Sequence, residues 1–274
     1  MNVLGTKVGL LGANINASGT QGGGTVRIGG EYKGEGPLPN ADVTLISGDS
    51  TIGANALSQG DGGRIIVWSD QTTRAYANIS ARGGASSGNG GFVETSSGGF
   101  LDVTNAPDVA APNGLGGTWL IDPRNITIVA GAADTSIGFG DVPISSPFNA
   151  IADDATLAVG DILAALSGGA NVIVSTESTG SQEGNITLAA ALDFNGKGTN
   201  TLTFNAANNI NINATIFDSD SLTNNDSLNL FLNAGNNVNV NSAIATGVVM
   251  GVEGNLNVTA TTGNIPARTR VLSL

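Results

Sequence analysis

The sequence predicts an all-β fold in which short strands wind into a parallel β-helix, and three observations support this. A pair of glycines opens a short run of β-forming residues four times, at Gly23-Gly24, Gly62-Gly63, Gly90-Gly91 and Gly116-Gly117. Residues 205–213 return 28 positions later as residues 233–241, with the same alternation of Asn and aliphatic residues. Aromatic residues make up only 4 % of the chain, so the core consists of small aliphatics that suit thin layers. Repeats spaced by about 20 to 50 residues are typical of stacked architectures.

The first 124 residues are expected to contain only short strands. Runs of β-forming residues alternate there with clusters of Gly, Ser, Asn and Asp. The expected strands cover residues 8–16, 25–28, 42–46, 64–68, 75–79, 91–95, 100–103 and 118–121. The glycine pairs are 39, 28 and 26 residues apart, and a longer excursion around residues 31–40 accounts for the largest spacing.

Aligning the four strand starts predicts which side chains enter the core. Side chains of a strand alternate between the two faces of its sheet. The inward column then holds Val26, Ile65, Val93 and Trp119. The outward column holds Arg27, Ile66, Glu94 and Leu120. Arg27 and Glu94 are expected to lie in solvent.

The repeat is interrupted in the middle of the chain. One more strand is expected at residues 125–129, followed by a loop over residues 130–154. Residues 161–166 are predicted to form one short helix, with Asp161 as its N-cap and a glycine pair at its end. The chain therefore divides into a β-helix segment with Gly-Gly repeats (1–129), an irregular connection with a short helix (130–169) and a second β-helix segment (170–274).

The second β-helix segment is rich in Asn and repeats about every 28 residues. Strands are expected at residues 171–175, 185–189, 201–205, 210–213, 227–232, 238–241, 248–252 and 255–260. In residues 209–213 the two Ile side chains point inward and the Asn side chains outward. Stacked Asn side chains can form hydrogen-bonded ladders from coil to coil. This stabilising role is preferred to ligand binding by the same asparagines.

Composition excludes several classes of function. The net charge is −12, with 22 acidic and 10 basic residues, and no basic patch that would bind phosphates is present. Nucleic acid is therefore not an expected partner. The chain has no Cys and no His, which removes disulfides and the commonest general base and transition-metal ligand. No apolar run approaches the roughly 18 residues of a membrane helix, and residues 1–5 do not resemble a signal peptide.

An enzyme of the β-helix class would need clustered carboxylates. The only tight acidic groups are Asp153-Asp154 and Asp218-Ser219-Asp220. Asp218, Asp220 and Asp226 form the strongest candidate for Ca²⁺, although their spacing does not match an EF-hand. No catalytic, cofactor-binding or metal-binding residue is therefore predicted, and no cofactor is expected.

Both tryptophans lie in expected strands, at Trp68 and Trp119. An exposed aromatic side chain on a rod could stack on a sugar ring, whereas a buried one would fill a wide coil. The structural role is the preferred interpretation for both residues.

Several segments resemble filamentous-haemagglutinin-type exoproteins, the large surface adhesins of bacteria with an outer membrane. They are residues 14–19 (NINASG), 22–30 (GGGTVRIGG), 61–68 (DGGRIIVW), 78–84 (NISARGG), 88–96 (GNGGFVETS) and 117–123 (GTWLIDP). The resemblance covers residues 3–130 and extends to residues 161–187. It implies a right-handed parallel β-helix rod that leaves the cell by two-partner secretion through a dedicated outer-membrane pore. The NPNL and NPNGI motifs of the family's secretion domain do not occur here, so the chain resembles an interior stretch of the rod.

The function implied by this resemblance is that of a structural and adhesive rod segment, secreted or exposed at the cell surface. Its partners would be glycans or proteins on host or neighbouring cells. Such a segment is not expected to be an enzyme. Two alternatives stay open. A carbohydrate-active β-helix enzyme would show three converging carboxylates. A non-functional fragment of a larger exoprotein gene would have open rod ends that promote end-to-end self-association.

Overall fold

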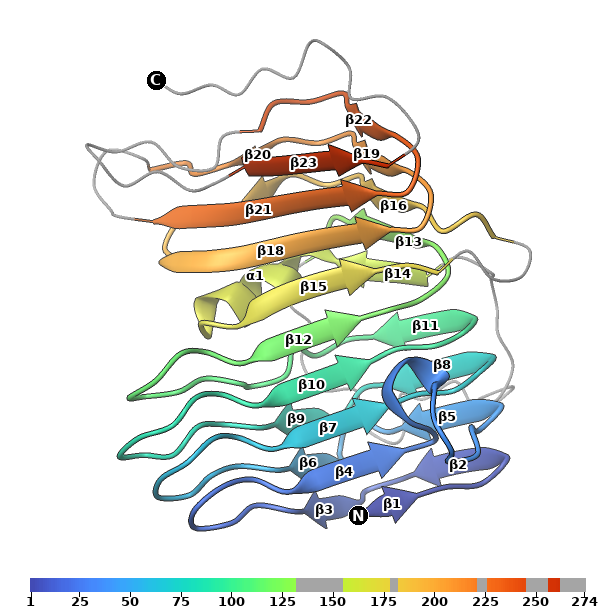
Figure 1. Cartoon of the computed structure of the whole chain (residues 1–274), viewed down its shortest axis with the longest axis vertical. Coiled ribbons are helices and arrows are strands. Elements are labelled where there is room, and N and C mark those ends of the chain that lie inside the picture. Colours follow the sequence, from blue (N-terminus) through green and yellow to red (C-terminus); the bar gives the residue numbers. More distant parts are fainter. Residues whose placement is uncertain (132–154, 178–181, 221–225, 245–255, 262–274) are drawn as a thin grey trace.

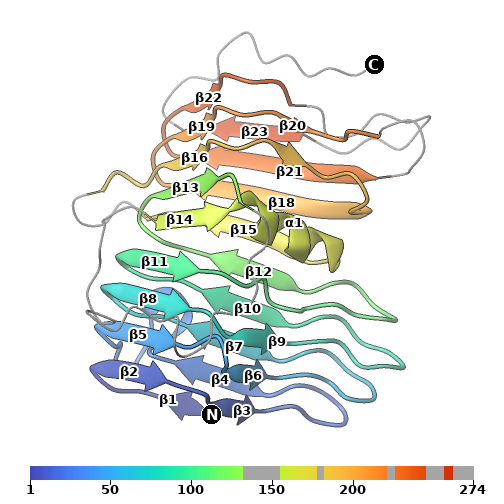
Figure 2. The ribbon, with the colours of Figure 1, turned by 180° about the vertical axis from the view of Figure 1, so that it is seen from behind.

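A computed structural model describes residues 1–131, 155–177, 182–220, 226–244 and 256–261, which form a parallel β-solenoid (Figure 1). The chain runs along one sheet, returns behind it in the opposite direction and climbs from the N-terminus toward the C-terminus (Figures 1 and 2). This path is a right-handed coil. All pairings between the described strands are parallel, so the predicted fold is confirmed.

Two nine-stranded sheets form the main faces, and shorter sheets lie on a third side. The first sheet contains, in spatial order, β1 (Asn2–Val3), β4 (Thr25–Ile28), β7 (Arg64–Val67), β10 (Phe92–Thr95), β12 (Thr118–Ile121), β15 (Asn171–Ser175), β18 (Thr199–Ala206), β21 (Ser227–Ala234) and β23 (Leu256–Ala260). The second contains β2 (Lys7–Leu10), β5 (Val43–Ile46), β8 (Thr72–Ala75), β11 (Phe100–Val103), β14 (Ala155–Ala158), β13 (Ile126–Val129), β16 (Ile186–Leu188), β19 (Ile210–Ile212) and β22 (Val238–Val240). The third side carries β3 (Asn14–Asn16), β6 (Thr51–Gly53) and β9 (Asn78–Ser80), and further along the rod β17 (Leu192–Asp193) and β20 (Ile216–Phe217).

Most expected strands agree with these bounds within two residues, and the exceptions lie at corners. The single strand expected over residues 8–16 is wrong, because Gly12 has a φ of 57° and turns the chain between β2 and β3. The strand expected over residues 75–79 is also wrong, since this segment spans the corner between β8 and β9. The strands β1, β6, β14, β17 and β20 were not predicted, and β14 lies within the connection that was expected to be irregular. The strand expected at residues 248–252 and the loop at 132–154 lie outside the described residues.

The predicted inward column is confirmed. Neighbouring strands pair in register through four residues that are fully buried, namely Val26, Ile65, Val93 and Trp119. They belong to one continuous hydrophobic core that extends from Val8 to Ile244. The indole Nε1 of Trp119 donates a hydrogen bond to Oγ1 of Thr95 at 2.9 Å, which satisfies its polar atom inside the core. The structural role expected for Trp119 is therefore confirmed.

The glycine pairs let consecutive coils approach closely where the strands of the first sheet begin. A Cβ atom added to Gly91 would lie 2.1 Å from the carbonyl oxygen of Gly63. A Cβ added to Gly117 would lie at the same distance from the carbonyl oxygen of Gly91. Side chains would force these coils apart, so the repeat that predicted the fold is a packing requirement.

The predicted helix is present but begins earlier than expected. Helix α1 (Val159–Ser167) follows β14 directly, and its N-cap is Ala158. The prediction of Asp161 as N-cap is wrong, because Asp161 lies buried in the first turn. Strand β14 inserts between β11 and β13, so the spatial order of the second sheet departs from the sequence order there.

The asparagines of the last coils form the predicted ladders. Strands β18 and β21, and likewise β19 and β22, pair with an offset of 28 residues. The side-chain Nδ2 of one Asn donates to Oδ1 of its equivalent in the preceding coil, for the pairs Asn233–Asn205 (2.9 Å), Asn236–Asn208 (3.2 Å), Asn237–Asn209 (3.0 Å), Asn239–Asn211 (2.8 Å) and Asn241–Asn213 (2.8 Å). The ladders add side-chain hydrogen bonds to the backbone bonds between coils.

Residues 29–41, which we call the clasp, leave the second coil between β4 and β5 and cross the outer surface of the first sheet (Figure 1). The backbone N–H of Lys33 donates to Oε1 of Glu94 on β10 at 3.0 Å. The Nζ of Lys33 lies 2.6 Å from Oδ2 of Asp122, just beyond β12. Gly34 packs against the indole of Trp68, so that Trp68 is buried beneath the clasp. The clasp therefore joins the second coil to coils that are not its neighbours.

The clasp changes the environment of the outward column. The prediction that Glu94 lies in solvent is wrong, because the clasp buries Glu94 completely together with Ile66 and Leu120. Arg27 is partly buried and pairs with Glu31 of the clasp at 2.9 Å. Alternation along a strand gives the face of each side chain but does not show what covers that face.

Burial raises the pKa of Glu94 from 4.5 to about 7, although the hydrogen bond from Lys33 opposes this. The folded state then binds a proton more tightly than the unfolded state, so this carboxyl weakens the fold as the pH rises from about 4.5 through 7. The substitution Glu94→Gln should remove this loss. Between pH 5 and pH 8 the free energy of unfolding of the variant should therefore fall by up to about 3 kcal/mol less than that of the wild type. Urea denaturation at several pH values measures the difference.

The control for this prediction is Glu35→Gln, which alters an exposed carboxylate of the same clasp. It should change the pH dependence of stability much less than Glu94→Gln does. Equal pH slopes for the wild type and Glu94→Gln would contradict the prediction.

Candidate ligand groove

The three short strands of the third side present a polar surface. Ile15, Ile52 and Ile79 occupy the middle position of β3, β6 and β9 and point into the core. Their neighbours on either side must face outward because strand side chains alternate. The register aligns Asn14, Thr51 and Asn78 in one outward column, with all three residues exposed. Equivalent side chains repeat at the strand spacing of about 4.8 Å along the rod.

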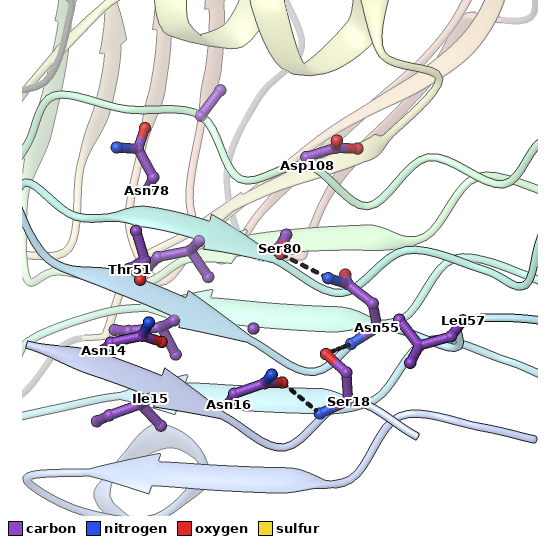
Figure 3. A pocket seen from close by; sticks show the side chains of 14 residues that line it. Asn14, Ile15, Asn16, Ser18, Thr51, Asn55, Leu57, Asn78, Ser80 and Asp108 are labelled. Carbon is purple, nitrogen blue, oxygen red and sulfur yellow. Dashed lines mark hydrogen bonds between the residues drawn. The ribbon is translucent and has the colours of Figure 1, made fainter. Parts of the chain in front are cut away.

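These columns line a groove of about 500 Å³ (Figure 3). Its lining consists of Asn14, Ile15, Asn16, Ser18, Thr51, Ile52, Gly53, Asn55, Leu57, Asn78, Ile79, Ser80, Ala106 and Asp108. The residues come from four successive coils, so the groove exists only when the coils are stacked.

A hydrogen-bond network fixes one wall of the groove. Oδ1 of Asn16 accepts from the backbone N–H of Ser18 at 2.9 Å, and Oγ of Ser18 accepts from the N–H of Asn55 at 3.0 Å. Nδ2 of Asn55 donates to Oγ of Ser80 at 3.0 Å, as drawn in Figure 3. Oδ1 of Asn55 accepts from the N–H of Arg82 at 2.8 Å. This wall is therefore held in place before any ligand arrives.

The chemistry of the groove suits a neutral, hydroxyl-rich ligand. Amide side chains both donate and accept hydrogen bonds, and hydroxyls do the same. Asp108 is the only ionisable residue in the lining, and it is ion-paired with Arg82. Leu57 is 60 % exposed and adds an apolar contact at the edge. A single paired carboxylate does not provide the two carboxylates of glycoside hydrolysis.

The acidic residues considered for Ca²⁺ accept hydrogen bonds from backbone N–H groups in turns. The carboxylate of Asp226 accepts hydrogen bonds from the backbone N–H groups of Gly196 and Gly198. Oδ1 of Asp218 accepts from the N–H of Asp220 at 3.0 Å. The Asp153-Asp154 pair lies outside the described residues.

The tryptophans are not available for sugar stacking, since Trp119 lies in the core and Trp68 under the clasp. Nε1 of Trp68 donates to Oδ1 of Asp70 at 2.9 Å. The structural role expected for Trp68 is confirmed, although it fills the space beneath the clasp rather than the inside of a coil.

The groove was not predicted from the sequence, although the sequence contains a weak pattern that points to it. Three triplets carry a polar or small residue on each side of an isoleucine, at Asn14–Asn16, Thr51–Gly53 and Asn78–Ser80. Their spacings of 37 and 27 residues differ too much to be recognised as a repeat. The irregular spacing arises because the clasp lies between β3 and β6 and lengthens the second coil.

No group of three His, Cys, Asp or Glu residues suited to a metal ion occurs in the part of the chain that the structure describes. None of the described helices has the length and apolar character needed to cross a membrane. Comparison with known proteins found no matching family model and no significantly similar curated sequence.

Proposed function

We propose that this chain is a structural and adhesive rod segment of a filamentous-haemagglutinin-like adhesin that reaches the cell surface by two-partner secretion. The observation that carries the proposal is the uninterrupted parallel solenoid, with a single core from the first coil to the last described ones. Four of the segments that resemble the family contain β4, β7, β10 and β12, which are consecutive strands of the first sheet. The resemblance therefore follows the repeating unit of the rod.

A rod of this kind presents a binding surface at a distance from the cell that carries it. Nine strands at about 4.8 Å spacing give a length on the order of 40 Å for the first sheet. Solenoid coils are stabilised mainly by their neighbours, and here the clasp adds contacts over several coils. The preformed polar groove faces outward on the third side and supports attachment to glycans or proteins of another cell.

An antiserum against the chain tests the cellular part of the proposal. In fractions of the native organism, we expect a band well above 27.2 kDa in the medium or at the outer surface, because the chain would be one stretch of a larger exoprotein. A band near 27.2 kDa that is confined to the cytoplasm would refute adhesion for this product.

The groove gives a second prediction. The purified chain should bind members of a panel of immobilised neutral oligosaccharides, and the double substitution Asn14→Ala with Asn78→Ala should weaken that binding at least tenfold. Each lost hydrogen bond to the ligand, at two of the three stacked positions, should reduce the binding free energy by on the order of 1 kcal/mol. Surface plasmon resonance measures the change.

The matched control is Asn2→Ala, which alters an exposed asparagine on the first sheet and should bind like the wild type. Binding unaffected by the double substitution would place the adhesive surface elsewhere. Release of new reducing ends from soluble polysaccharides would instead favour the carbohydrate-active enzyme.

A further inference from the structure

The clasp places a lysine against a carboxylate that water does not reach. The Asp122 side chain is fully buried, and its Oδ2 lies 2.6 Å from Nζ of Lys33. The same Nζ donates to Oγ of Ser175 on β15 at 3.4 Å. Lys33 is the only non-glycine among the described residues with a positive φ, at 55°. This backbone conformation is unfavourable for a lysine, so the surrounding contacts must hold it.

A second buried carboxyl lies beside this pair. Glu94 is opposite Leu120 in the register of β10 and β12, and Asp122 follows two residues later on the same face. Glu94 and Asp122 are therefore diagonal neighbours under the clasp. Oε1 of Glu94 accepts a hydrogen bond from the backbone N–H of Lys33. The buried Oε2 has no hydrogen-bond partner in the described part of the chain. An unpartnered buried carboxyl oxygen favours the neutral acid over the carboxylate.

We propose that Lys33 and Asp122 form an intramolecular isopeptide bond, with Glu94 positioning the lysine and exchanging protons with the reacting groups. An amine in contact with a carboxyl group, dry surroundings and a neighbouring acid are the requirements for forming an amide without an added reagent. The fixed position of the clasp replaces a bimolecular encounter, which can lower the barrier by about 7–11 kcal/mol.

The reaction is balanced without a co-reactant. A proton first moves from the Lys33 ammonium to the Asp122 carboxylate, which gives a neutral amine and a carboxylic acid. The lone pair of Nζ then forms a bond to Cγ of Asp122. The nitrogen loses its remaining extra proton, and the acid hydroxyl accepts one and leaves as water. As a neutral acid, Glu94 supplies the proton to the leaving hydroxyl and takes up the one that the nitrogen loses. The products are one amide and one water molecule.

Burial shifts both carboxyl groups toward the neutral form, whereas Lys33 stays charged. Burial raises the pKa of Asp122 despite its contact with Lys33, and it raises the pKa of Glu94 to about 7. Burial also acts to lower the pKa of Lys33, but hydrogen bonding and attraction to Asp122 leave this pKa raised. The ion pair is therefore the resting form, and the reaction proceeds from a minor neutral population.

The bond would change the mechanics of the rod. It would link the clasp to the end of β12 and close a covalent ring over residues 33–122 that contains β7, β10 and β12 of the first sheet. Separating these coils by tension would then require breaking a covalent bond. An ion pair alone would not provide this resistance.

Intact-mass spectrometry of the purified full chain tests the proposal. We expect a mass lower than the sequence mass by one water molecule, and a proteolytic digest should contain a branched peptide that joins the segments around Lys33 and Asp122. A chain with the full sequence mass, both when purified and after prolonged incubation at pH 6 and pH 8, would overturn the proposal. This result does not depend on any variant folding.

Three variants identify the participating residues. Lys33→Arg retains the charge but should have the full sequence mass, as should Asp122→Ala. Glu94→Gln should decrease the crosslinked fraction at least tenfold at equal times, and an unchanged fraction would refute the role of Glu94. Lys7→Arg is the matched control, because Lys7 is an exposed lysine on β2, and it should crosslink like the wild type. Loss of water in Lys33→Arg would show that the crosslink involves another residue and would overturn the assignment.

Discussion

Replacing Gly91 by alanine is expected to prevent the chain from reaching its native fold. The added Cβ would lie 2.1 Å from the carbonyl oxygen of Gly63 and 2.7 Å from the carbonyl carbon of Gly62. Both contacts are with backbone atoms of the neighbouring coil, which cannot move without breaking the hydrogen bond from Phe92 N to Gly63 O. We expect a loss of more than about 4 kcal/mol in the free energy of unfolding, a large part of the stability of a typical domain.

The yield of soluble protein and its thermal unfolding by circular dichroism measure this effect. Gly9→Ala is the matched control, because Gly9 also lies in a strand but has no atom within 4 Å of the added Cβ. It should leave the thermal midpoint nearly unchanged or slightly higher, since alanine restricts the unfolded chain. Similar midpoints for the two variants would mean that close stacking at the glycine pairs does not limit stability.

Replacing Trp119 by alanine is expected to produce the largest loss among the core residues of the first sheet. Trp119 is fully buried and contacts the coils on both sides through its pairing with Val93 and Val172. Its removal leaves a cavity that the surrounding strands cannot fill, and it leaves Oγ1 of Thr95 without the indole donor. Large-to-small substitutions of this kind cost about 3–5 kcal/mol.

Chemical denaturation of Trp119→Ala gives the change in free energy, with Leu115→Ala as its control. Leu115 is 76 % exposed, so its truncation should change the free energy of unfolding by less than about 0.5 kcal/mol. A change of similar size in both variants would contradict the placement of Trp119 in the core. Because the core is continuous, hydrogen exchange in Trp119→Ala should increase first in β10, β12 and β15, the strands next to the cavity.

The two substitutions act on different properties of a solenoid. Gly91 determines how closely two coils approach at a corner, whereas Trp119 determines how well the space inside them is filled. The clasp adds a third element, since it connects the second coil to β10, β12 and β15 through Lys33. A purely nearest-neighbour description of stability therefore does not hold in the first half of the rod.

Local patterns in the sequence determined the coiled architecture and the inward face of each strand. The glycine pairs mark the strand starts, and the alternation from Val26 to Trp119 assigns the core. The 28-residue offset between Asn211 and Asn239 predicts the ladders. These features were predictable because each depends on a few adjacent residues repeated in the next coil.

The tertiary structure alone decided what covers the outer faces and what meets at the surface. Glu94 follows the same outward alternation as a solvated residue, but the clasp from a distant part of the chain buries it beside Asp122. The groove likewise depends on the stacking of Asn14, Thr51 and Asn78, whose spacing in the sequence is irregular. In both cases the decisive contacts join residues tens of positions apart. Their positions follow from the path of the whole chain, since excursions such as the clasp set which coils and side chains come together.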